Sequence, residues 1–397
     1  MNAYAFARPP KPTAPQQLVE LLHELGREVL APHAAEVDVD ARFPIEAFDA
    51  LKRERLLGAY VPLEYGGMGL NLEELAKVCE VLGQYCSATA MVYAMHQIQV
   101  ACIVHHALES DYFRNFLRRI CEDQLLLASA TTEVGIGGDL RSSICAVELD
   151  GDAFRVTKKA PVISYMDAAD ALLLTARRSS EGSAGDQVQV LLLKPDMQLE
   201  PMCGWDTLGF RGTCSSGFTV HGRGHKEQIL PVPYAEIHAR TMHPVAHLVW
   251  AALWIGIGID AMARARSVVR AQARKTPDAL PIAATRLAEA DMVLQTMRAG
   301  LSQILNEYRQ MLPDASLDAF SHFGFNIRVN NLKLNTSTLL VDLVGRAMVI
   351  GGINAYRNDS DVSLGRHLRD AYGTMLMVNN DRLLGLNAAM QIVQKDV

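Results

Sequence analysis

The spacing of apolar residues changes twice along the chain, and this change constrains the fold more than any other feature. Between Gln16 and about Ile120, apolar residues recur at three- and four-residue steps, as at Leu18, Leu22 and Leu25, which is typical of amphipathic helices. From about residue 124 to about residue 233, short apolar runs alternate with Gly and Asp. That pattern is typical of antiparallel strands joined by turns.

After Pro244 the helical spacing returns and persists to the C-terminus. We therefore expect a mainly α protein with a central β-domain, in three parts. Residues 1–123 form a helical domain, residues 124–235 a β-domain and residues 236–397 a second helical domain. A chain of 397 residues is longer than one hydrophobic core usually holds, which fits several packed parts.

The composition excludes several classes of protein. Hydrophobic residues make up 49% of the chain and charged residues 21%, an ordinary globular balance that excludes disordered and fibrous proteins. The net charge is −6 without a basic run, so we expect no nucleic acid partner. The longest uncharged apolar run, residues 248–259, is shorter than the ~20 residues that span a bilayer. We expect a buried helix there and no association with a membrane.

Seven cysteines are scattered along the chain, and no two have C-x-x-C spacing. An odd number of dispersed cysteines favours reduced thiols and a cytoplasmic protein. The N-terminal residues contain no apolar stretch of the kind found in secretory signals.

Four short motifs follow one another along the chain. They are LGAYVPLEYGGMGL at residues 57–70, TEVGIGGD at 132–139, LGFRGT at 208–213 and RHLRDA at 366–371. In order and spacing they resemble the glycine-rich loop, the T-E-P-x-A-G-S-D segment, the L-G-x-R-x-S/T turn and the R-x-x-R-D-A element of the acyl-CoA dehydrogenase family. The resemblance covers roughly residues 15–395.

This resemblance implies the fold of that family: an N-terminal α-helical domain, a middle antiparallel β-domain and a C-terminal four-helix bundle. It implies bound FAD and an acyl thioester substrate. It also implies an electron-transfer flavoprotein or another electron acceptor, and a homo-oligomer that is a dimer or a tetramer.

Residues that follow the expected strand 125–130 fit a flavin site. Thr131 and Thr132 carry hydroxyls and backbone N–H groups that can bond the pyrimidine oxygens of a flavin. Gly137 and Gly138 permit a close approach of the backbone to a ligand. The alternative is an ordinary glycine-rich hairpin turn.

Ile163 and Ser164 match the family strand that lies along the flavin ring. Val162 stands where the family often has Trp, so the chain leaves space beside the flavin. Ser164 can hydrogen-bond the isoalloxazine, and the alternative is a plain serine on an edge strand.

The resemblance also assigns residues in the C-terminal part to FAD. Arg270 matches an arginine that pairs with the pyrophosphate, for which a guanidinium is suited; the alternative is a solvated arginine on a basic helix end. Gly351 and Gly352 match an element that contacts the adenosine end of FAD bound largely by a neighbouring subunit. Val349 replaces the usual Gln there, and the glycines can instead end a helix.

The usual catalytic base of the family is missing. Most members carry a Glu just past the R-D-A helix, and that position is Val378, which cannot accept a proton. Other members carry the Glu at the start of the first C-terminal helix, a position that falls near His247. Asp381 is a second candidate, because it lies about one turn beyond Val378 if that segment is helical.

Both candidate bases have a structural alternative. His243 and His247 are four residues apart and can form a purely structural pair on one helix face, and residues 379–381 can cap a helix. The two histidines also have the spacing of metal ligands. The sequence places no third ligand beside them, so we expect no metal site.

The sequence predicts an FAD-dependent acyl-CoA (acyl-thioester) dehydrogenase that removes hydrogens from the α and β carbons and transfers a hydride to the flavin. One alternative is a flavin-dependent monooxygenase on the same fold, favoured by the missing Glu and by Val162. The other is a non-catalytic subunit derived from the family.

Overall fold

The N-terminal part of the protein is helical. The computed structural model describes residues 15–275, 277, 279–313 and 317–394. The first helices are α1 (Pro15–Leu25), α2 (Ala31–Val39), α3 (Ile45–Arg53), α4 (Leu72–Tyr85), α5 (Ser87–His106) and α6 (Asp111–Asp123). Helix α4 begins with a capping box, in which Asn71 and Glu74 each accept a hydrogen bond from the other's backbone N–H.

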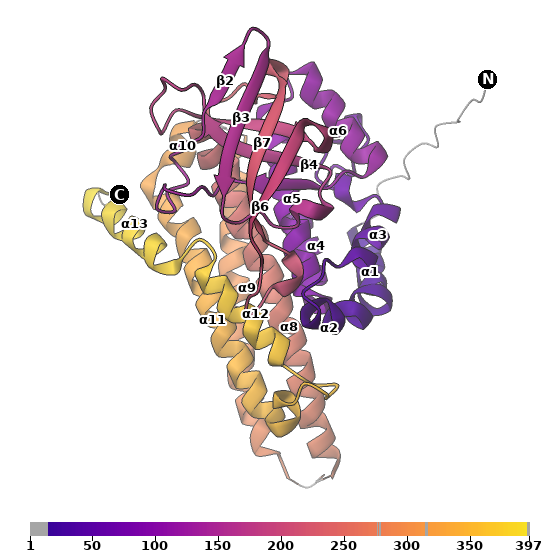
Figure 1. The fold of residues 1–397 in the computed structure, drawn as a ribbon. Helices are drawn as coiled ribbons and strands as arrows, with labels where there is room; N and C mark the ends of the chain where they lie inside the picture. The colour runs from indigo at the N-terminus through magenta and orange to yellow at the C-terminus, as the bar shows by residue number, and fades with distance from the viewer. Residues whose placement is uncertain (1–14, 276, 278, 314–316, 395–397) are drawn as a thin grey trace, which may run out of the picture.

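Two sheets follow, and they lie in the upper part of the molecule in Figure 1, with α6 beside them. The first contains β1 (Leu127–Ala130), β4 (Ala171–Arg177) and β5 (Gln187–Leu193), and the second contains β2 (Val147–Asp150), β3 (Ala153–Ala160), β7 (Gly217–His225) and β6 (Met197–Cys203). The ladders are antiparallel as expected, except that β1 pairs with β4 in parallel. After β1 the chain leaves the first sheet and forms β2 and β3 in the second sheet. It then re-enters the first sheet as β4, which runs in the same direction as β1.

The C-terminal part is a bundle of long helices. After α7 (Tyr234–Ile237) and a π-helical turn (His238–Met242) come α8 (His243–Lys275), α9 (Ile282–Met311), α10 (Leu317–Ser321), α11 (Phe323–Tyr356), α12 (Gly365–Leu376) and α13 (Asn380–Val393). Helices α8, α9, α11 and α12 pack along one another and extend away from the sheets, whereas α13 points to one side (Figure 1).

Three segments are long and apolar enough to cross a membrane by length and composition: Ser87–His106, Tyr234–Lys275 and Phe323–Tyr356. In the first two, 89% and 83% of the most apolar window is buried inside the protein. In the third only 44% is buried, which leaves one side of α11 open to the surface. Residues 248–259 form the buried helix segment that their sequence predicts.

One carboxylate links all three parts of the chain. Asp370 lies on α12, and it accepts hydrogen bonds from the Ser87 hydroxyl at the start of α5 and from the backbone N–H of Phe210, at 2.6 Å, in the β region. The Asp370 side chain is buried, and burial raises its pKa above the ordinary value. Since both donors are buried with it, each of the three parts needs the others in place.

The motifs at 208–213 and 366–371 meet at this link. Arg369 donates to the backbone carbonyl of Leu208, at 3.0 Å, and to the carboxylate of Asp38 on α2. A Cβ atom at Gly209 would come 2.4 Å from the carbonyl oxygen of Arg369, so only glycine allows this approach. These two motifs therefore hold the helical and β parts together.

We predict that Asp370→Ala lowers the free energy of unfolding by about 2–5 kcal/mol, because two buried donors lose their acceptor. Urea denaturation followed by circular dichroism measures the change. Ser87→Ala is the matched control, since it removes one of the two donors and should cost about 1 kcal/mol. Equal losses in the two variants would contradict the linking role of the carboxylate.

Candidate functional site

The segment after β1 lies against the segment after β3. Thr131 and Thr132 are half-buried, and the Thr132 hydroxyl donates a hydrogen bond of 3.0 Å to the backbone carbonyl of Val162. Val162 is 38% exposed. The structure thus brings together two segments that the sequence assigned to a flavin ring, and the Val162 side chain there is exposed.

A chain of hydroxyls fixes Ser164. Its Oγ lies 2.7 Å from Oγ of Ser215, which lies 2.7 Å from Oγ1 of Thr213. Ile163 beside it is fully buried and donates its backbone N–H to Ser216 at 2.8 Å. Ser164 is 6% exposed, so its hydroxyl is held in place by protein contacts and has a small open surface.

The glycine-rich loop that follows Thr132 packs against the start of α13. Gly137 and Gly138 have φ of +60° and +78° and are exposed. A Cβ atom at Gly138 would come 3.1 Å from a guanidinium nitrogen of Arg382, which pairs with Asp139 at 3.3 Å. Arg382 therefore occupies space that a larger residue at Gly138 would need.

A buried ion pair anchors the same loop. Glu133 accepts hydrogen bonds of 2.6 Å from the Ser143 hydroxyl and from the Cys145 N–H, and its carboxylate lies 3.1 Å from the ammonium of Lys158. Burial works against the charged carboxylate, but Lys158 and the hydrogen bonds outweigh it, and the pKa of Glu133 lies below its ordinary value. Neither residue of this pair was among those predicted from the sequence.

The remaining residues assigned to FAD lie elsewhere. Arg270 is exposed near the end of α8, which lies at the far end of the bundle from the sheets in Figure 1. Gly351 and Gly352 stand at the end of α11, where Gly352 leaves the helical conformation at φ 61° and ψ −146°. Arg264 of α8 donates to the carbonyls of Asp361 and Ser363 just beyond, so both helix ends lie together.

Helix α8 has 33 residues and carries Arg270 along the bundle, away from the sheets. The assignment of Arg270 to FAD together with Thr132 and Ser164 stays a prediction.

The segment that replaces the usual base is not helical. Helix α12 ends at Leu376 and α13 begins at Asn380, and between them Val378 and Asn379 have φ of +52° and +23°. Asp381 therefore does not lie one turn along a helix from Val378, contrary to the assumption that made it a candidate. Asn379 caps α13 by accepting the N–H groups of Asp381 and Arg382, and the Asp381 side chain is exposed.

His247 belongs to a row of aromatic rings along one face of α8. His243 lies between His238, stacked at a centroid distance of 5.6 Å, and His247, edge-on at 4.6 Å. The row begins at Tyr234 and ends at Trp250. A π-helical turn separates His238 from His243, and such turns are frequent at functional sites.

The hydrogen bonds of these imidazoles fix their tautomers. Nδ1 of His247 lies 3.4 Å from the carbonyl oxygen of Val329, so it carries the proton and leaves Nε2 as an acceptor. His243 Nε2 lies 2.8 Å from Oδ1 of Asn330. Burial, and after it the neighbouring His243 and Lys333, hold the pKa of His247 well below the ordinary value, so the ring is neutral at pH 7.

Lys333 lies on α11 one turn beyond Val329 and was not among the residues predicted from the sequence. The side chain is fully buried, and its ammonium donates a 2.6 Å hydrogen bond to Oδ1 of Asn380, the first residue of α13. Burial lowers the pKa of Lys333 to about 8. Leu332 and Leu334 flank it, so no local pattern marks it as a functional residue.

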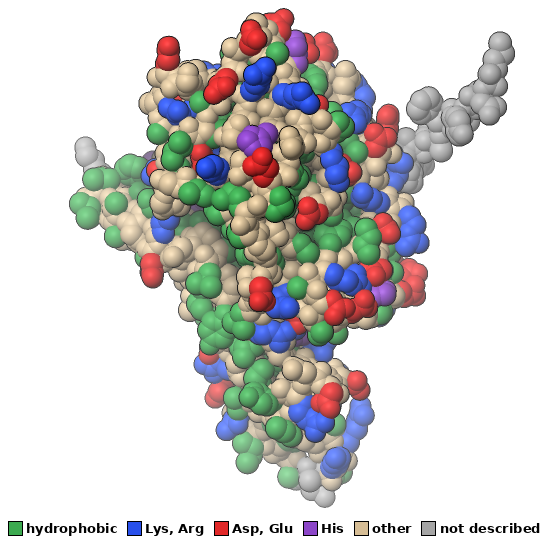
Figure 2. All heavy atoms as spheres, viewed as in Figure 1, with side chains coloured by type: hydrophobic (Ala, Val, Ile, Leu, Met, Phe, Trp, Pro, Cys, Tyr) green, Lys and Arg blue, Asp and Glu red, His purple; other side chains and the backbone are tan. Residues whose placement is uncertain are grey.

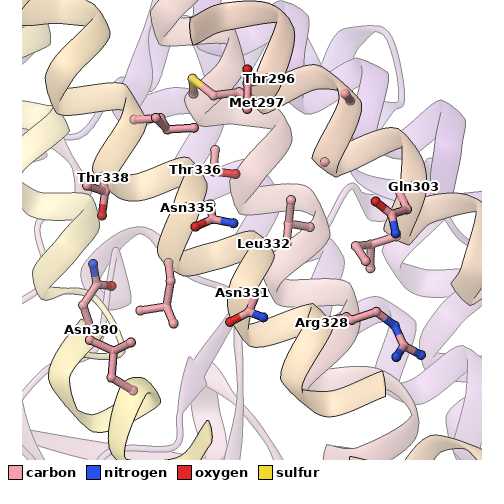
Figure 3. A pocket seen from close by; sticks show the side chains of 16 residues that line it. Thr296, Met297, Gln303, Arg328, Asn331, Leu332, Asn335, Thr336, Thr338 and Asn380 are labelled. Carbon is pink, nitrogen blue, oxygen red and sulfur yellow. The ribbon is translucent and has the colours of Figure 1, made fainter. Parts of the chain in front are cut away.

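A groove of about 730 Å³ lies between α9, α11 and α13. Amide side chains line much of it, among them Gln303, Asn331, Asn335 and Asn380, which come from all three helices (Figure 3). The residues predicted to bind FAD do not line this groove.

Apolar side chains are exposed along the outer side of the bundle, where they gather over α11, α12 and α13 in Figure 2. They include Val349, Ile353, Tyr356, Leu376 and Leu384. Among the described residues, no group of three or more His, Cys, Asp and Glu side chains is arranged to hold a metal ion.

Comparison with known sequences finds similarity to acyl-CoA dehydrogenases. Residues 13–124 match the acyl-CoA dehydrogenase N-terminal domain. The chain is 30% identical over 172 residues to cyclohex-1-ene-1-carbonyl-CoA dehydrogenase of Syntrophus aciditrophicus (strain SB), a match that covers 42% of this chain and 41% of that protein. It thus spans less than half the length of that relative. A short-chain-specific acyl-CoA dehydrogenase of Clostridium acetobutylicum is 21% identical over 371 residues, 90% of this chain and 93% of that one.

Solved structures have the same fold. Butyryl-CoA dehydrogenase from Megasphaera elsdenii matches with a TM-score of 0.79 at 18% identity, over 99% of this chain and all of that one. The dibenzothiophene monooxygenase from Paenibacillus sp. A11-2 also matches with a TM-score of 0.79 at 18% identity, over 96% and 98%. The expected fold, mainly α with a central β-domain, is confirmed.

We predict that Glu133→Gln lowers the free energy of unfolding by about 3–5 kcal/mol, because the Lys158 ammonium is left buried without its counter-charge. The double variant Glu133→Gln/Lys158→Met should recover most of this loss, since it removes the orphaned charge. Thermal and urea denaturation of the two variants measure both effects. A double variant no more stable than the single one would show that the pair does not act through its charge.

Proposed function

We propose that the chain is a member of the acyl-CoA dehydrogenase family and that it is an FAD-dependent oxidoreductase that dehydrogenates an acyl thioester. The proposed reaction removes a proton from the α carbon and a hydride from the β carbon. When bound, the flavin supplies the acceptor for that hydride. The observation that carries the proposal is the meeting of Thr132 with Val162, next to the fixed hydroxyl of Ser164.

The residues around this meeting point fit a flavin. Thr131 and Thr132 can present hydroxyl and N–H donors to ring oxygens, and nothing lies within 4 Å of the position that a Cβ atom would take at Gly137. Ser164 presents an oriented hydroxyl. Val162 is smaller than the Trp of many relatives and leaves room along the ring face.

His247 is the better of the two candidate bases. It is neutral at pH 7 and its Nε2 carries a lone pair, whereas Asp381 is exposed at the start of α13. In the proposed reaction the α-proton passes to Nε2 of His247, and Nδ1–H stays on the carbonyl of Val329. A depressed pKa makes His247 a weak base, so turnover is slow unless something raises its basicity.

We further propose that the working form is a dimer or tetramer. Arg270, Gly351 and Gly352 are too far along the bundle to join Thr132 and Ser164 in one chain, so they would serve the FAD of a neighbouring subunit. The exposed apolar side chains over α11 to α13 give such a neighbour a surface to cover. An electron-transfer flavoprotein or another acceptor would reoxidise the flavin.

A second candidate is a flavin-dependent monooxygenase. It is favoured by the space beside Val162 and by Val378, which leaves the site without a carboxylate at the usual position. The two functions differ in their reductant, because a dehydrogenase takes electrons from the thioester and a monooxygenase takes them from added reductant and consumes O₂.

The function is tested by anaerobic mixing of the FAD-loaded protein with acyl-CoAs. We expect the flavin absorbance to bleach without added reductant, and we expect His247→Gln to slow bleaching about 100-fold or more at unchanged FAD content. Asp381→Asn is the control and should change the rate little. Consumption of O₂ that depends on added reductant, without bleaching by any acyl-CoA, would support the monooxygenase instead.

The oligomer is tested by light scattering together with the flavin content. We expect Arg270→Ala to lower FAD affinity while the protein remains a dimer or tetramer, because the arginine acts on a neighbour's cofactor. Arg274→Ala, an exposed arginine one turn further along α8, is the matched control. A monomer that holds FAD stoichiometrically would rule out a shared site.

A further inference from the structure

We propose that Lys333 binds an acidic group at the end of the substrate's acyl chain, and that this ion pair makes His247 a stronger base. The substrate class is therefore a thioester of a dicarboxylic acid rather than of a simple fatty acid. This inference rests on the proposed function, since it concerns the same site.

The first observation is a buried cation without an anion. Lys333 is fully buried, and no carboxylate oxygen of the described residues lies within 4.0 Å of its ammonium. Its partner is Asn380, a neutral acceptor at 2.6 Å. By contrast, the other fully buried lysine of the described chain, Lys158, has Glu133 at 3.1 Å. A buried charge without a counter-charge is costly, and an anionic ligand would remove that cost.

The second observation is the position of Lys333. Asn380 is two residues beyond Val378, so the ammonium lies against the segment that carries the base in other family members. That segment joins α12 and α13 through two residues with left-handed φ. To bind Lys333, a substrate carboxylate needs to displace only the neutral carboxamide oxygen of Asn380. The displaced Asn380 side chain can keep its 3.1 Å hydrogen bond to the Ser337 hydroxyl.

The third observation is the effect of Lys333 on His247. Val329, whose carbonyl holds His247, and Lys333 are four residues apart and share one face of α11. The ammonium is one of the charges that lower the pKa of His247. Pairing Lys333 with an anion cancels this influence, so the pKa of His247 rises toward its ordinary value when an acidic acyl group is bound.

Other charges near the row of histidines do not provide this anion. His243 and His238 face His247 from the same helical face. Arg141, Asp139 and Arg382 act on His238 at the far end of the row, and Asp139 there already lies within ion-pair distance of both arginines. Asp381 is exposed at the outer surface of α13. The site as a whole therefore keeps an excess of positive charge.

The experiment compares glutaryl-CoA with pentanoyl-CoA, which have acyl chains of equal length, on the FAD-loaded protein and on Lys333→Met. Anaerobic flavin reduction gives the rates, and isothermal titration calorimetry gives the dissociation constants. We expect the wild type to prefer glutaryl-CoA. Lys333→Met should lower the second-order rate constant of flavin reduction by glutaryl-CoA about 100-fold. It should raise the rate of flavin reduction at saturating pentanoyl-CoA about threefold, because no neighbouring ammonium then lowers the pKa of His247.

Opposite signs for the two substrates are the decisive result. A purely structural lysine would move both rates together, and a lysine that accepted the proton itself would abolish both reactions. Either outcome overturns the proposal. The control Lys159→Met removes an exposed lysine from β3 and should leave both substrates unaffected.

A second variant tests the same proposal if Lys333→Met folds poorly. Asn380→Ala removes the acceptor that competes with the substrate, and it should tighten glutaryl-CoA about threefold or more without tightening pentanoyl-CoA. Equal effects on the two ligands would overturn the proposal. If glutaryl-CoA binds in a Lys333-dependent manner but neither thioester bleaches the flavin, the anion site stands and the dehydrogenase function fails.

Discussion

The arrangement of the whole molecule depends on the buried carboxylate of Asp370. It is the one acceptor shared by the start of α5, the turn before β7 and helix α12, and these belong to the three parts of the chain. Arg369 and Gly209 add a contact that tolerates no side chain at the glycine. Because α12 is fixed in this way, the segment that follows it, with Val378, is held against α11 and the glycine-rich loop rather than free in solution.

The electrostatic character of the candidate site follows from that placement. Where the family pattern has a carboxylate, this chain has Val378. The buried ammonium of Lys333 bonds Asn380, two residues further on, and it acts on the neutral imidazole of His247. Such a site stabilises negative charge better than it removes protons. This is why the proposed reaction depends on His247 and why the proposed substrate carries its own negative charge.

The long bundle determines how a cofactor would be shared. Helices α8 and α11 have 33 and 34 residues, so residues near their far ends cannot reach the sheets of the same chain. The residues predicted to bind FAD lie in two separate parts of the chain. A second chain packed against the bundle would explain this separation and would also cover the apolar surface along α11 to α13. Stability and cofactor affinity are then linked to the assembly.

The sequence by itself determined the order of helical and β parts and the family fold, because burial of one face imposes a helical or strand period on neighbouring residues. Local patterns also identified Thr132, Val162 and Ser164, which lie just beyond the ends of β1 and β3, where the two sheets meet through the hydrogen bond from Thr132 to Val162. The parallel pairing of β1 with β4, the distance of Arg270 from those residues, the break at Val378 and the burial of Lys333 were decided by the tertiary structure. Each depends on which distant segments meet, and in particular on α8 and α13 closing over a lysine that its own neighbours in sequence do not distinguish.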